Sequence, residues 1–334
     1  MTSTLHDNYN SDRIVFPSFD ELPPVPGQPQ GSLWNFFDKD GKKDELGTLN
    51  ILTPSVVRET SEEIQLGYHV QLDWPLDRLE FPGLGRQKTT HSVKDMRPEG
   101  FEGLDDEIFM NTQISSQWDS LKHWSIQKQG LFYNGLDMKE ALESPRNGIH
   151  NICDRGGIVG RGILVDWLRW WEIHNSGKTP PSPIQSYAIS VSEIEQVLKW
   201  QGTETKQGDI FIIRTGYVRW YEQADTATRR HGTQEQNCAI GVANTIETVH
   251  WLYDKHFSAV ASDTLSFESW PYPEACCLHE WLLCQWGTPI GELWDLEQLS
   301  RKCASLGKWS FFLTSAPLHI KGGIGSPPGA IAIF

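Results

Sequence analysis

The sequence lacks the apolar run of roughly 18 residues that a membrane helix requires, and its polar first residues predict no secretory signal peptide. Its six cysteines form no CxxC pair, so we expect reduced, buried thiols in a cytoplasmic protein. Cationic side chains are also scarce, with 29 lysines and arginines against 43 aspartates and glutamates. The resulting formal charge of −14 argues against nucleic acid or an anionic membrane as a main partner.

Nucleotide-binding signatures are missing as well. The glycine-rich stretch 321–328 has no Lys-Ser/Thr after it, and no GxGxxG motif opens a helix, so we expect no nucleotide cofactor. Tryptophan, in contrast, is abundant, with fifteen residues. Most of these indoles should fill a large core, but several stand near polar motifs, which favours a pocket for a flat or apolar small molecule. These are Trp118, Trp124, Trp270, Trp281, Trp286 and Trp294.

The length of 334 residues is enough for one large domain or two smaller ones. Residues 1–30 are rich in proline and acidic residues and predict an extended N-terminal arm, packed on the body or on a partner subunit. In residues 31–334, predicted helices and strands alternate without strict βαβ regularity, and no linker interrupts them. We therefore expect one α/β domain with a mixed sheet.

Hydrophobic periodicity and capping residues place the elements. Thr53 and Pro54 predict the start of a helix, and Gly307 predicts the end of another. The predicted helices cover 55–66, 139–143, 192–201 (capped by Ser190 or Ser192), 237–253, 274–285 and 296–306. The predicted strands cover 68–76, 160–166, 210–214, 259–262, 309–314 and 330–334. Residues 80–105, rich in glycine, proline and charge, predict a loop over or beside the functional site.

The most informative stretch runs from Gln113 to His123 and reads QISSQWDSLKH. Asp119 and His123 stand four residues apart, as in a metal site or an acid/base pair. Gln113 and Gln117 stand four residues apart where imidazoles would be the natural ligands. Because a carboxamide oxygen binds Zn²⁺ or Mn²⁺ much more weakly than imidazole does, the stretch predicts a metal site that has been altered.

With its surroundings, this stretch resembles the metal-dependent cyclase/hydrolase family that includes bacterial-type kynurenine formamidase and isatin hydrolase. The family signature HxGTHxDxPxH aligns with QxSSQxDSLKH, and the likeness extends over about residues 30–334. It is similar to the fungal and actinobacterial branch, with glutamine in place of two signature histidines. The other segments that carry the resemblance are 156–162, 208–210, 214–216, 261–263, 278–279, 291–292, 316–318 and 322–327.

The resemblance implies a barrel-like β core flanked by helices, assembled as a homodimer or larger oligomer. It also implies one divalent ion, zinc or manganese. Asp119 matches a bridging ligand and His123 the acid/base histidine. His279 and Glu292 match the ligands that lie far along the chain. Gln113 and Gln117 would then contact the substrate instead of the metal.

We therefore expect a hydrolase that opens or closes an amide or lactone bond in a small aromatic or polyketide-type metabolite. Two alternatives stay open at this point. One is a metal-free cyclase, dehydratase or isomerase of specialised metabolism that uses His123 as acid/base. The other is a non-catalytic protein that binds an aromatic ligand. In each case an apolar slot formed by Trp118, Trp124, Phe132 and Tyr133 would hold the ligand.

Each residue also has a purely structural interpretation. Gln113 and Gln117 could bond main-chain groups on a strand, and His123 could be a core histidine with satisfied hydrogen bonds. His279 could lie on the surface of its helix, and Glu292 could cap the segment that follows it. Only the positions of these side chains in the folded chain can separate the two interpretations.

Overall fold

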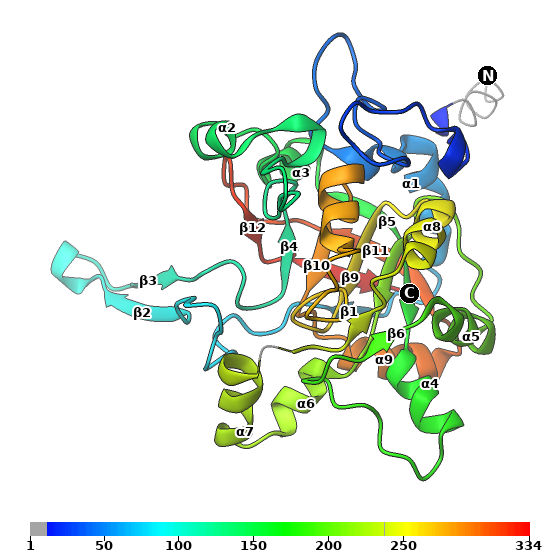
Figure 1. The fold of residues 1–334 in the computed structure, drawn as a ribbon. Helices are drawn as coiled ribbons and strands as arrows, with labels where there is room; N and C mark the ends of the chain where they lie inside the picture. The colour runs from blue at the N-terminus through cyan, green and yellow to red at the C-terminus, as the bar shows by residue number, and fades with distance from the viewer. Residues whose placement is uncertain (1–11, 237) are drawn as a thin grey trace, which may run out of the picture.

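A curled, mixed sheet lies at the centre of the computed structural model, which describes residues 12–236 and 238–334 (Figure 1). Within these residues the sheet has nine strands in the order β1-β13-β11-β5-β7-β9-β10-β4-β12. Its strands are β1 (His69–Gln71), β4 (Gln117–Asp119), β5 (Ile158–Val165), β7 (Ile210–Ile213), β9 (Ala259–Ser262), β10 (Ile290–Glu292), β11 (Ser310–Ser315), β12 (Gly325–Ser326) and β13 (Ala330–Ile333). The predicted α/β class with a mixed, barrel-like core is confirmed.

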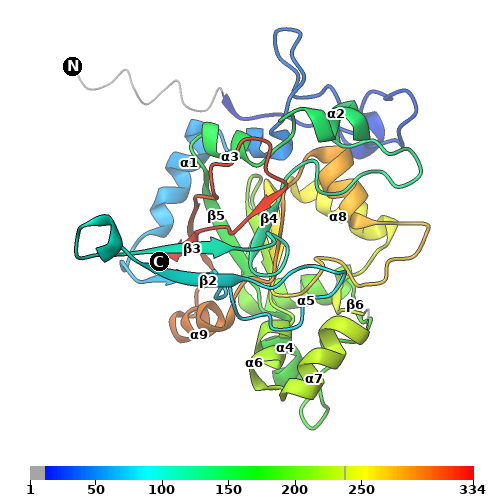
Figure 2. The same ribbon diagram turned by 90° about the vertical axis from the view of Figure 1, so that its left-hand side faces the viewer.

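Helices surround this sheet (Figures 1 and 2), and two further pairs of strands form small sheets of their own. The pairs are β2 (Thr90–Asp95) with β3 (Leu104–Phe109), and β6 (Ala188–Ile189) with β8 (Gly241–Val242). The helices are α1 (Pro54–Thr60), α2 (Met138–Glu143), α3 (His150–Asp154), α4 (Trp167–His174), α5 (Val191–Gln201), α6 (Tyr217–Gln223), α7 (Thr226–Arg230), α8 (Ile246–Lys255), α9 (Glu297–Leu306) and the π-helix Glu280–Trp286. Within the described residues, no helix is long and apolar enough to cross a membrane.

The middle of the sheet is parallel and buried on both faces. β5, β7, β9 and β10 run parallel to one another, and the outer strands pair antiparallel. Along β7, Phe211 and Ile213 face one cluster of apolar side chains, and Ile210 and Ile212 face the other. The first cluster includes α4, α5 and α8, and the second includes α1 and α9. Coverage of both faces explains why the central strands read as continuous apolar runs.

Several predicted boundaries are confirmed by their caps. The Thr53 side chain accepts a hydrogen bond from the Val56 amide at the start of α1. Ser190 caps α5 and forms a capping box with Glu193. Gly307 ends α9 in the left-handed conformation that glycine adopts without strain.

Other boundaries were predicted wrongly. The helix expected over 237–253 begins only at Ile246, because Gly241 and Val242 form a strand with β6 and Thr245 caps the helix; residue 237 lies outside the described residues. The chain expected to be helical over 274–285 becomes helical only from position 278. The helix expected over 55–66 ends at Thr60, and the strand expected over 68–76 is reduced to β1.

The largest correction concerns residues 80–105, which were expected to form a loop. Their second half enters a hairpin of β2 and β3 that extends away from the body (Figure 1). All twelve residues of these two strands are exposed. Residues directly opposite each other share a face, so Val93, Leu104 and Ile108 lie on one face of this hairpin. This face thus exposes three apolar side chains, and it also carries His91, Asp95 and Asp106.

The segment before the first strand lies against the body. Phe19 and Leu22 are buried in the larger apolar cluster, and the Tyr253 hydroxyl donates a hydrogen bond to the Pro17 carbonyl at 2.8 Å. The Gln30 amide donates to the carbonyls of Phe19 and Leu22 at 2.9 and 3.0 Å. The part of the predicted N-terminal arm formed by residues 1–11 lies outside the described residues.

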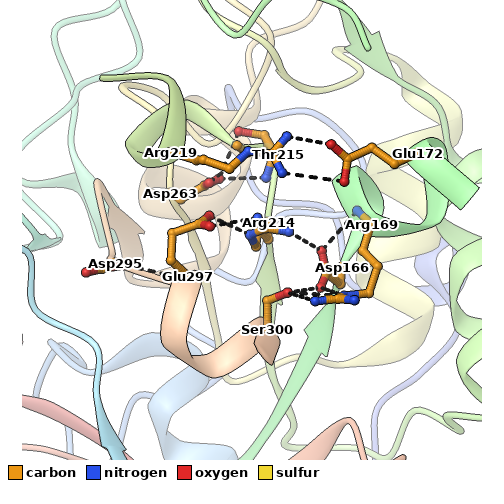
Figure 3. A network of polar contacts seen from close by, with 11 residues as sticks. Asp166, Arg169, Glu172, Arg214, Thr215, Arg219, Asp263, Asp295, Glu297 and Ser300 are labelled. Atoms are coloured by element: carbon orange, nitrogen blue, oxygen red, sulfur yellow. Dashed lines mark hydrogen bonds and ion pairs between the residues drawn. The ribbon is translucent and has the colours of Figure 1, made fainter. Parts of the chain in front are cut away.

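A buried ion-pair network holds the ends of β5 and β7 to α9 (Figure 3). The Arg214 guanidinium donates to Asp166 at 2.8 Å and to both oxygens of Glu297 at 2.7 and 2.9 Å. Asp166 also accepts hydrogen bonds from Arg169 and from the Ser300 hydroxyl. Burial lowers the pKa of Arg214, but the two carboxylates outweigh this effect and raise it. Arg214 is therefore the charge that makes burial of Asp166 tolerable.

We expect Arg214→Met to lower the free energy of unfolding by about 3 kcal/mol, because it leaves a buried carboxylate without its main counter-charge. Urea unfolding followed by tryptophan fluorescence measures the effect.

The matched control is Arg219→Met. Arg219 pairs with Glu172 in the same view (Figure 3), but both side chains are substantially exposed, and such surface pairs contribute less than about 1 kcal/mol. Equal losses in the two variants would contradict the role assigned to Arg214.

Candidate functional site

The register of β4 brings the motif residues together. β4 lies between β10 and β12, so that Glu292 stands opposite Gln117 and Gly325 stands opposite Asp119. Because side chains alternate along a strand, Gln117 and Asp119 share one face with Glu292. Trp118 points to the opposite face, where its indole donates to the Ser315 hydroxyl at 2.8 Å. Strand pairing therefore joins residues that are more than 170 positions apart in the sequence.

The two glutamines form a chain of hydrogen bonds between the two carboxylates. The Gln117 amide nitrogen donates to Glu292 Oε2 at 2.9 Å and to Gln113 Oε1 at 3.2 Å. The Gln113 amide nitrogen then donates to Asp119 Oδ1 at 2.6 Å. A carboxylate only accepts, so the amide nitrogens must face it. The Gln113 side chain thus holds Asp119 and the Gln117 side chain holds Glu292, while Gln117 Oε1 is buried without a hydrogen-bond partner among the described residues.

The glycine-rich turn makes room for this arrangement. A Cβ atom on Gly325 would lie 2.7 Å from Gln113 Nε2 and 3.2 Å from Thr112 Oγ1. A larger residue would therefore push the Gln113 side chain off Asp119. The stretch 321–328, which carries no nucleotide signature, has a packing role at the site.

His279, which directly precedes the π-helix Glu280–Trp286, is the third residue of the group formed with Asp119 and Glu292. Its Nε2 atom lies 3.2 Å from Glu292 Oε1 and 4.0 Å from Asp119 Oδ2. Its Nδ1 atom contacts Glu268 Oε2 at 2.7 Å, and its main-chain amide donates to Glu268 Oε1 at 3.2 Å. Burial lowers the pKa of His279, but Glu268 and Glu292 raise it well above the usual value. Glu268 therefore orients the ring so that Nε2 faces the other two carboxylates.

His123 lies on the other side of Asp119. Its Nε2 atom is 4.0 Å from Asp119 Oδ1, and its side chain is 16% exposed. Burial raises the pKa of Asp119; His123 and His279 act against this increase, and Glu292 adds to it. Asp119 is thus a buried carboxyl between two imidazoles, and only one of them, His123, retains access to solvent.

These residues fit a single divalent cation. One donor atom each from Asp119, His279 and Glu292 can be chosen so that all three lie within 4.8 Å of one another, and all three residues are buried. Tetrahedral zinc places neighbouring donors roughly 3.4 Å apart, close to the separations of 3.2 and 4.0 Å found here. Asp119 Oδ2 is buried without a hydrogen-bond partner among the described residues. A carboxylate behind the ligand histidine, here Glu268, is typical of metal sites.

A cavity of about 340 Å³ opens onto this group. Its walls include parts of the segments 79–86, 113–124, 233–236, 238–239 and 265–270, together with His279 and Glu292. Three predicted site residues line it, namely Gln113, His123 and Trp124, together with the predicted ligands His279 and Glu292. The size suits a small organic molecule.

The remaining predicted slot residues lie elsewhere, which corrects the sequence-based assignment. Trp118 and Tyr133 are fully buried, and Phe132 packs with Leu136 and Ala141 in a separate small cluster. The Tyr133 hydroxyl donates to Asp44 at 3.0 Å. Trp118 lies on the opposite face of β4 because side chains alternate along a strand, whereas Phe132 and Tyr133 lie beyond β4 and pack into other clusters.

Sequence reasoning missed three residues of the site. Glu268 gave no signal, because an isolated glutamate in an irregular segment has no recognisable spacing. Arg86 and Ser266 line the cavity and were not singled out, although Arg86 belongs to the segment 80–105 that was predicted to lie over or beside the site. Trp270, one of the tryptophans named as pocket candidates, does line the cavity.

Comparison with known proteins identifies the family. Residues 37–269 match the sequence profile of the family described as "Putative cyclase".

The chain belongs to this cyclase family. No curated protein matches its sequence.

Solved structures agree with the family assignment. A protein described as a novel cyclase is 29% identical, with a TM-score of 0.78 over 91% of this chain and 99% of that chain. Isatin hydrolase A from Ralstonia solanacearum is 16% identical, with a TM-score of 0.56 over 84% and 97%. Isatin hydrolase A from Labrenzia aggregata, bound to benzyl benzoate, is 16% identical, with a TM-score of 0.54 over 81% and 94%. The two isatin hydrolases share the fold of this cyclase.

We expect purified protein to bind about one equivalent of Zn²⁺ or Mn²⁺, and His279→Ala to remove most of this binding because the imidazole is the strongest ligand of the set. Glu268→Gln should weaken metal affinity about 10- to 100-fold, since it disturbs the ring that Glu268 orients. Elemental analysis and metal titration by calorimetry measure both effects.

His123→Ala is the matched control, because His123 stands beside Asp119 but outside the ligand set. Its metal content should equal that of the unaltered protein. Loss of metal in His123→Ala but not in His279→Ala would show that the cation lies elsewhere.

Proposed function

We propose that this cyclase-family protein hydrolyses an amide or lactone bond in a small aromatic or polyketide-type metabolite, or catalyses the reverse ring closure. The observation that carries the proposal is that His279, Glu292 and His123 line one cavity, with the buried Asp119 behind the two imidazoles. A carbonyl compound in that cavity would lie beside both a cation site and an acid/base group.

A zinc or manganese ion held by Asp119, His279 and Glu292 would supply Lewis acidity and lower the pKa of a bound water. Hydrolysis adds the water oxygen to the carbonyl carbon, breaks the carbon–nitrogen or carbon–oxygen bond, and moves one proton to the leaving atom. We assign that proton transfer to His123, because imidazole can accept and donate a proton near neutral pH. Asp119 keeps the His123 ring at the edge of the cavity.

The structural relatives support this type of reaction. Two of them are isatin hydrolases by name, and isatin is an aromatic cyclic amide. The aromatic wall formed by Trp124 and Trp270 fits a ligand of the same general shape. The substrate of this chain need not be isatin, because its glutamines at positions 113 and 117 change how the carboxylates are held.

A metal-free cyclase, dehydratase or isomerase is the second candidate. The observation that favours it is the hydrogen-bond chain from Glu292 through Gln117 and Gln113 to Asp119, which partly satisfies the carboxylates without a cation. In this reading His123 is again the acid/base group.

We expect His123→Ala to lower kcat about 10²- to 10⁴-fold without loss of metal, because it removes proton transfer alone. Turnover of a panel of aryl formamides, aromatic cyclic amides and lactones, followed by absorbance, measures this effect.

His319→Ala is the control, since His319 pairs with Asp154 at an exposed site away from the cavity. Chelation should abolish turnover, and zinc or manganese should restore it. Full turnover in excess chelator would instead establish the metal-free alternative, and unchanged turnover in His123→Ala would overturn the role of His123 in both.

We also propose that the chain self-associates as a homodimer or larger oligomer, and the hairpin of β2 and β3 supports this. A two-stranded hairpin is marginally stable alone in water, yet here Val93, Leu104 and Ile108 are 60%, 73% and 55% exposed on one face. Exposed apolar side chains of this kind are what a two-fold interface buries, and on the same face His91 and Asp106 already pair with each other.

The double variant Val93→Lys with Ile108→Lys should shift the protein from oligomer to monomer, because it places charge on the apolar face. Light scattering after size-exclusion chromatography measures the mass. Ser92→Lys, on the opposite face beside Glu107, should leave the mass unchanged. A monomeric unaltered protein would contradict self-association.

A further inference from the structure

Two polar atoms beside the cavity have no hydrogen-bond partner among the described residues. They are the Ser266 hydroxyl and the indole N–H of Trp124. Both residues line the cavity, but these two atoms are themselves buried and do not face its open space. A charged group of a ligand in the cavity therefore needs another partner on this wall.

A cation stands on the same wall. Arg86 is the only lysine or arginine among the described residues that line the cavity. Its Nη1 atom donates to the Gln113 carbonyl at 3.1 Å, and no carboxylate in the described chain forms an ion pair with it. Its guanidinium is half-buried and therefore less hydrated than an arginine on an open surface. In a chain with 43 acidic residues, a cavity arginine without an acidic partner calls for an explanation.

Arg86 is also held close to the cation site. The Gln113 main chain accepts its hydrogen bond, and the Gln113 side chain donates to Asp119 Oδ1. Gln113 thus links Arg86 to Asp119, a carboxylate of the proposed cation site. A substrate in contact with both Arg86 and the cation site would have to carry two polar groups separated by a short spacer.

We propose that Arg86 binds a carboxylate of the substrate and so determines specificity for aromatic acids that carry the reacting carbonyl elsewhere on the molecule. This assignment rests on the proposed function for the identity of the reacting bond, but not for the binding itself. The planar guanidinium matches a carboxylate in a two-point contact that lysine cannot reproduce. The aromatic wall of Trp124 and Trp270 holds the ring.

Benzoate and benzamide test this proposal because they have the same shape and differ in charge. We would measure their binding to the metal-loaded protein by quenching of tryptophan fluorescence and by calorimetry. Benzoate should bind about 10-fold more tightly than benzamide, and Arg86→Gln should weaken benzoate about 10- to 100-fold while leaving benzamide unchanged, since hydrogen bonds to charged groups are the strong ones. Arg86→Lys should give an intermediate value.

Arg78→Gln is the matched control, because Arg78 lies on the same segment but pairs with Glu222 outside the cavity. Equal weakening of benzoate and benzamide in Arg86→Gln would show a structural role and overturn the proposal. Unchanged benzoate binding would also overturn it, since the carboxylate would then be held elsewhere, for example by the metal. If Arg86→Gln fails to fold, Arg86→Lys provides the same comparison.

These binding measurements involve no turnover, so their failure is distinct from failure of the proposed hydrolysis. Selective loss of benzoate binding in a protein that turns over none of the test substrates would leave Arg86 as an anion site and refute the hydrolase. Turnover that depends on His123 without any Arg86 effect would refute the anion site alone.

Discussion

The site depends on the pairing of β4 with β10, a contact of only a few residues. That register puts Glu292 beside Gln117 and, one pleat further, Asp119 on the same face. Three carboxylates, Asp119, Glu268 and Glu292, are thereby buried around the His279 imidazole. Buried negative charge of this density is costly unless protons, hydrogen bonds or a cation offset it. Hydrogen bonds from the two glutamines offset part of this cost, and a bound cation would offset the remainder.

Gln113 and Gln117 change which side chains are available to a cation at this site. Imidazoles at positions 113 and 117 would be ligands, whereas amides at these positions donate to Asp119 and Glu292. The number of protein ligands available to one ion is thus reduced to one histidine and two carboxylates, which leaves positions open for water and substrate. The same amides hold the carboxylates in place when no ion is bound. Both of these properties follow from a single hydrogen-bond chain.

Much of the fold could be predicted from local patterns. Thr53, Ser190 and Gly307 marked helix ends because capping depends on the residue itself and its immediate neighbours. The buried central strands were recognisable as apolar runs. The late start of α8 was missed because β8 pairs with the distant strand β6, and such pairing outweighs local propensity. The hairpin at 90–109 was missed because its strands are exposed on both faces, so no buried face marks them in the sequence. The motif tryptophan Trp118 and the nearby Phe132 and Tyr133 were misplaced for a similar reason.

The sequence by itself determined the family, the α/β class, and the candidate ligands Asp119, His279 and Glu292 with His123 beside them. The α/β class follows from the pattern of the residues, and the candidate ligands follow from the resemblance of the motifs to the family. Only the tertiary structure decided that Gln113 and Gln117 face carboxylates, that Glu268 stands behind His279, and that Arg86 shares the cavity. The contact of Gln117 with Glu292 joins segments far apart in sequence, and the others depend on how irregular segments fold back on themselves. Such contacts are set by strand register and by packing of both faces of the sheet, and no local pattern encodes them.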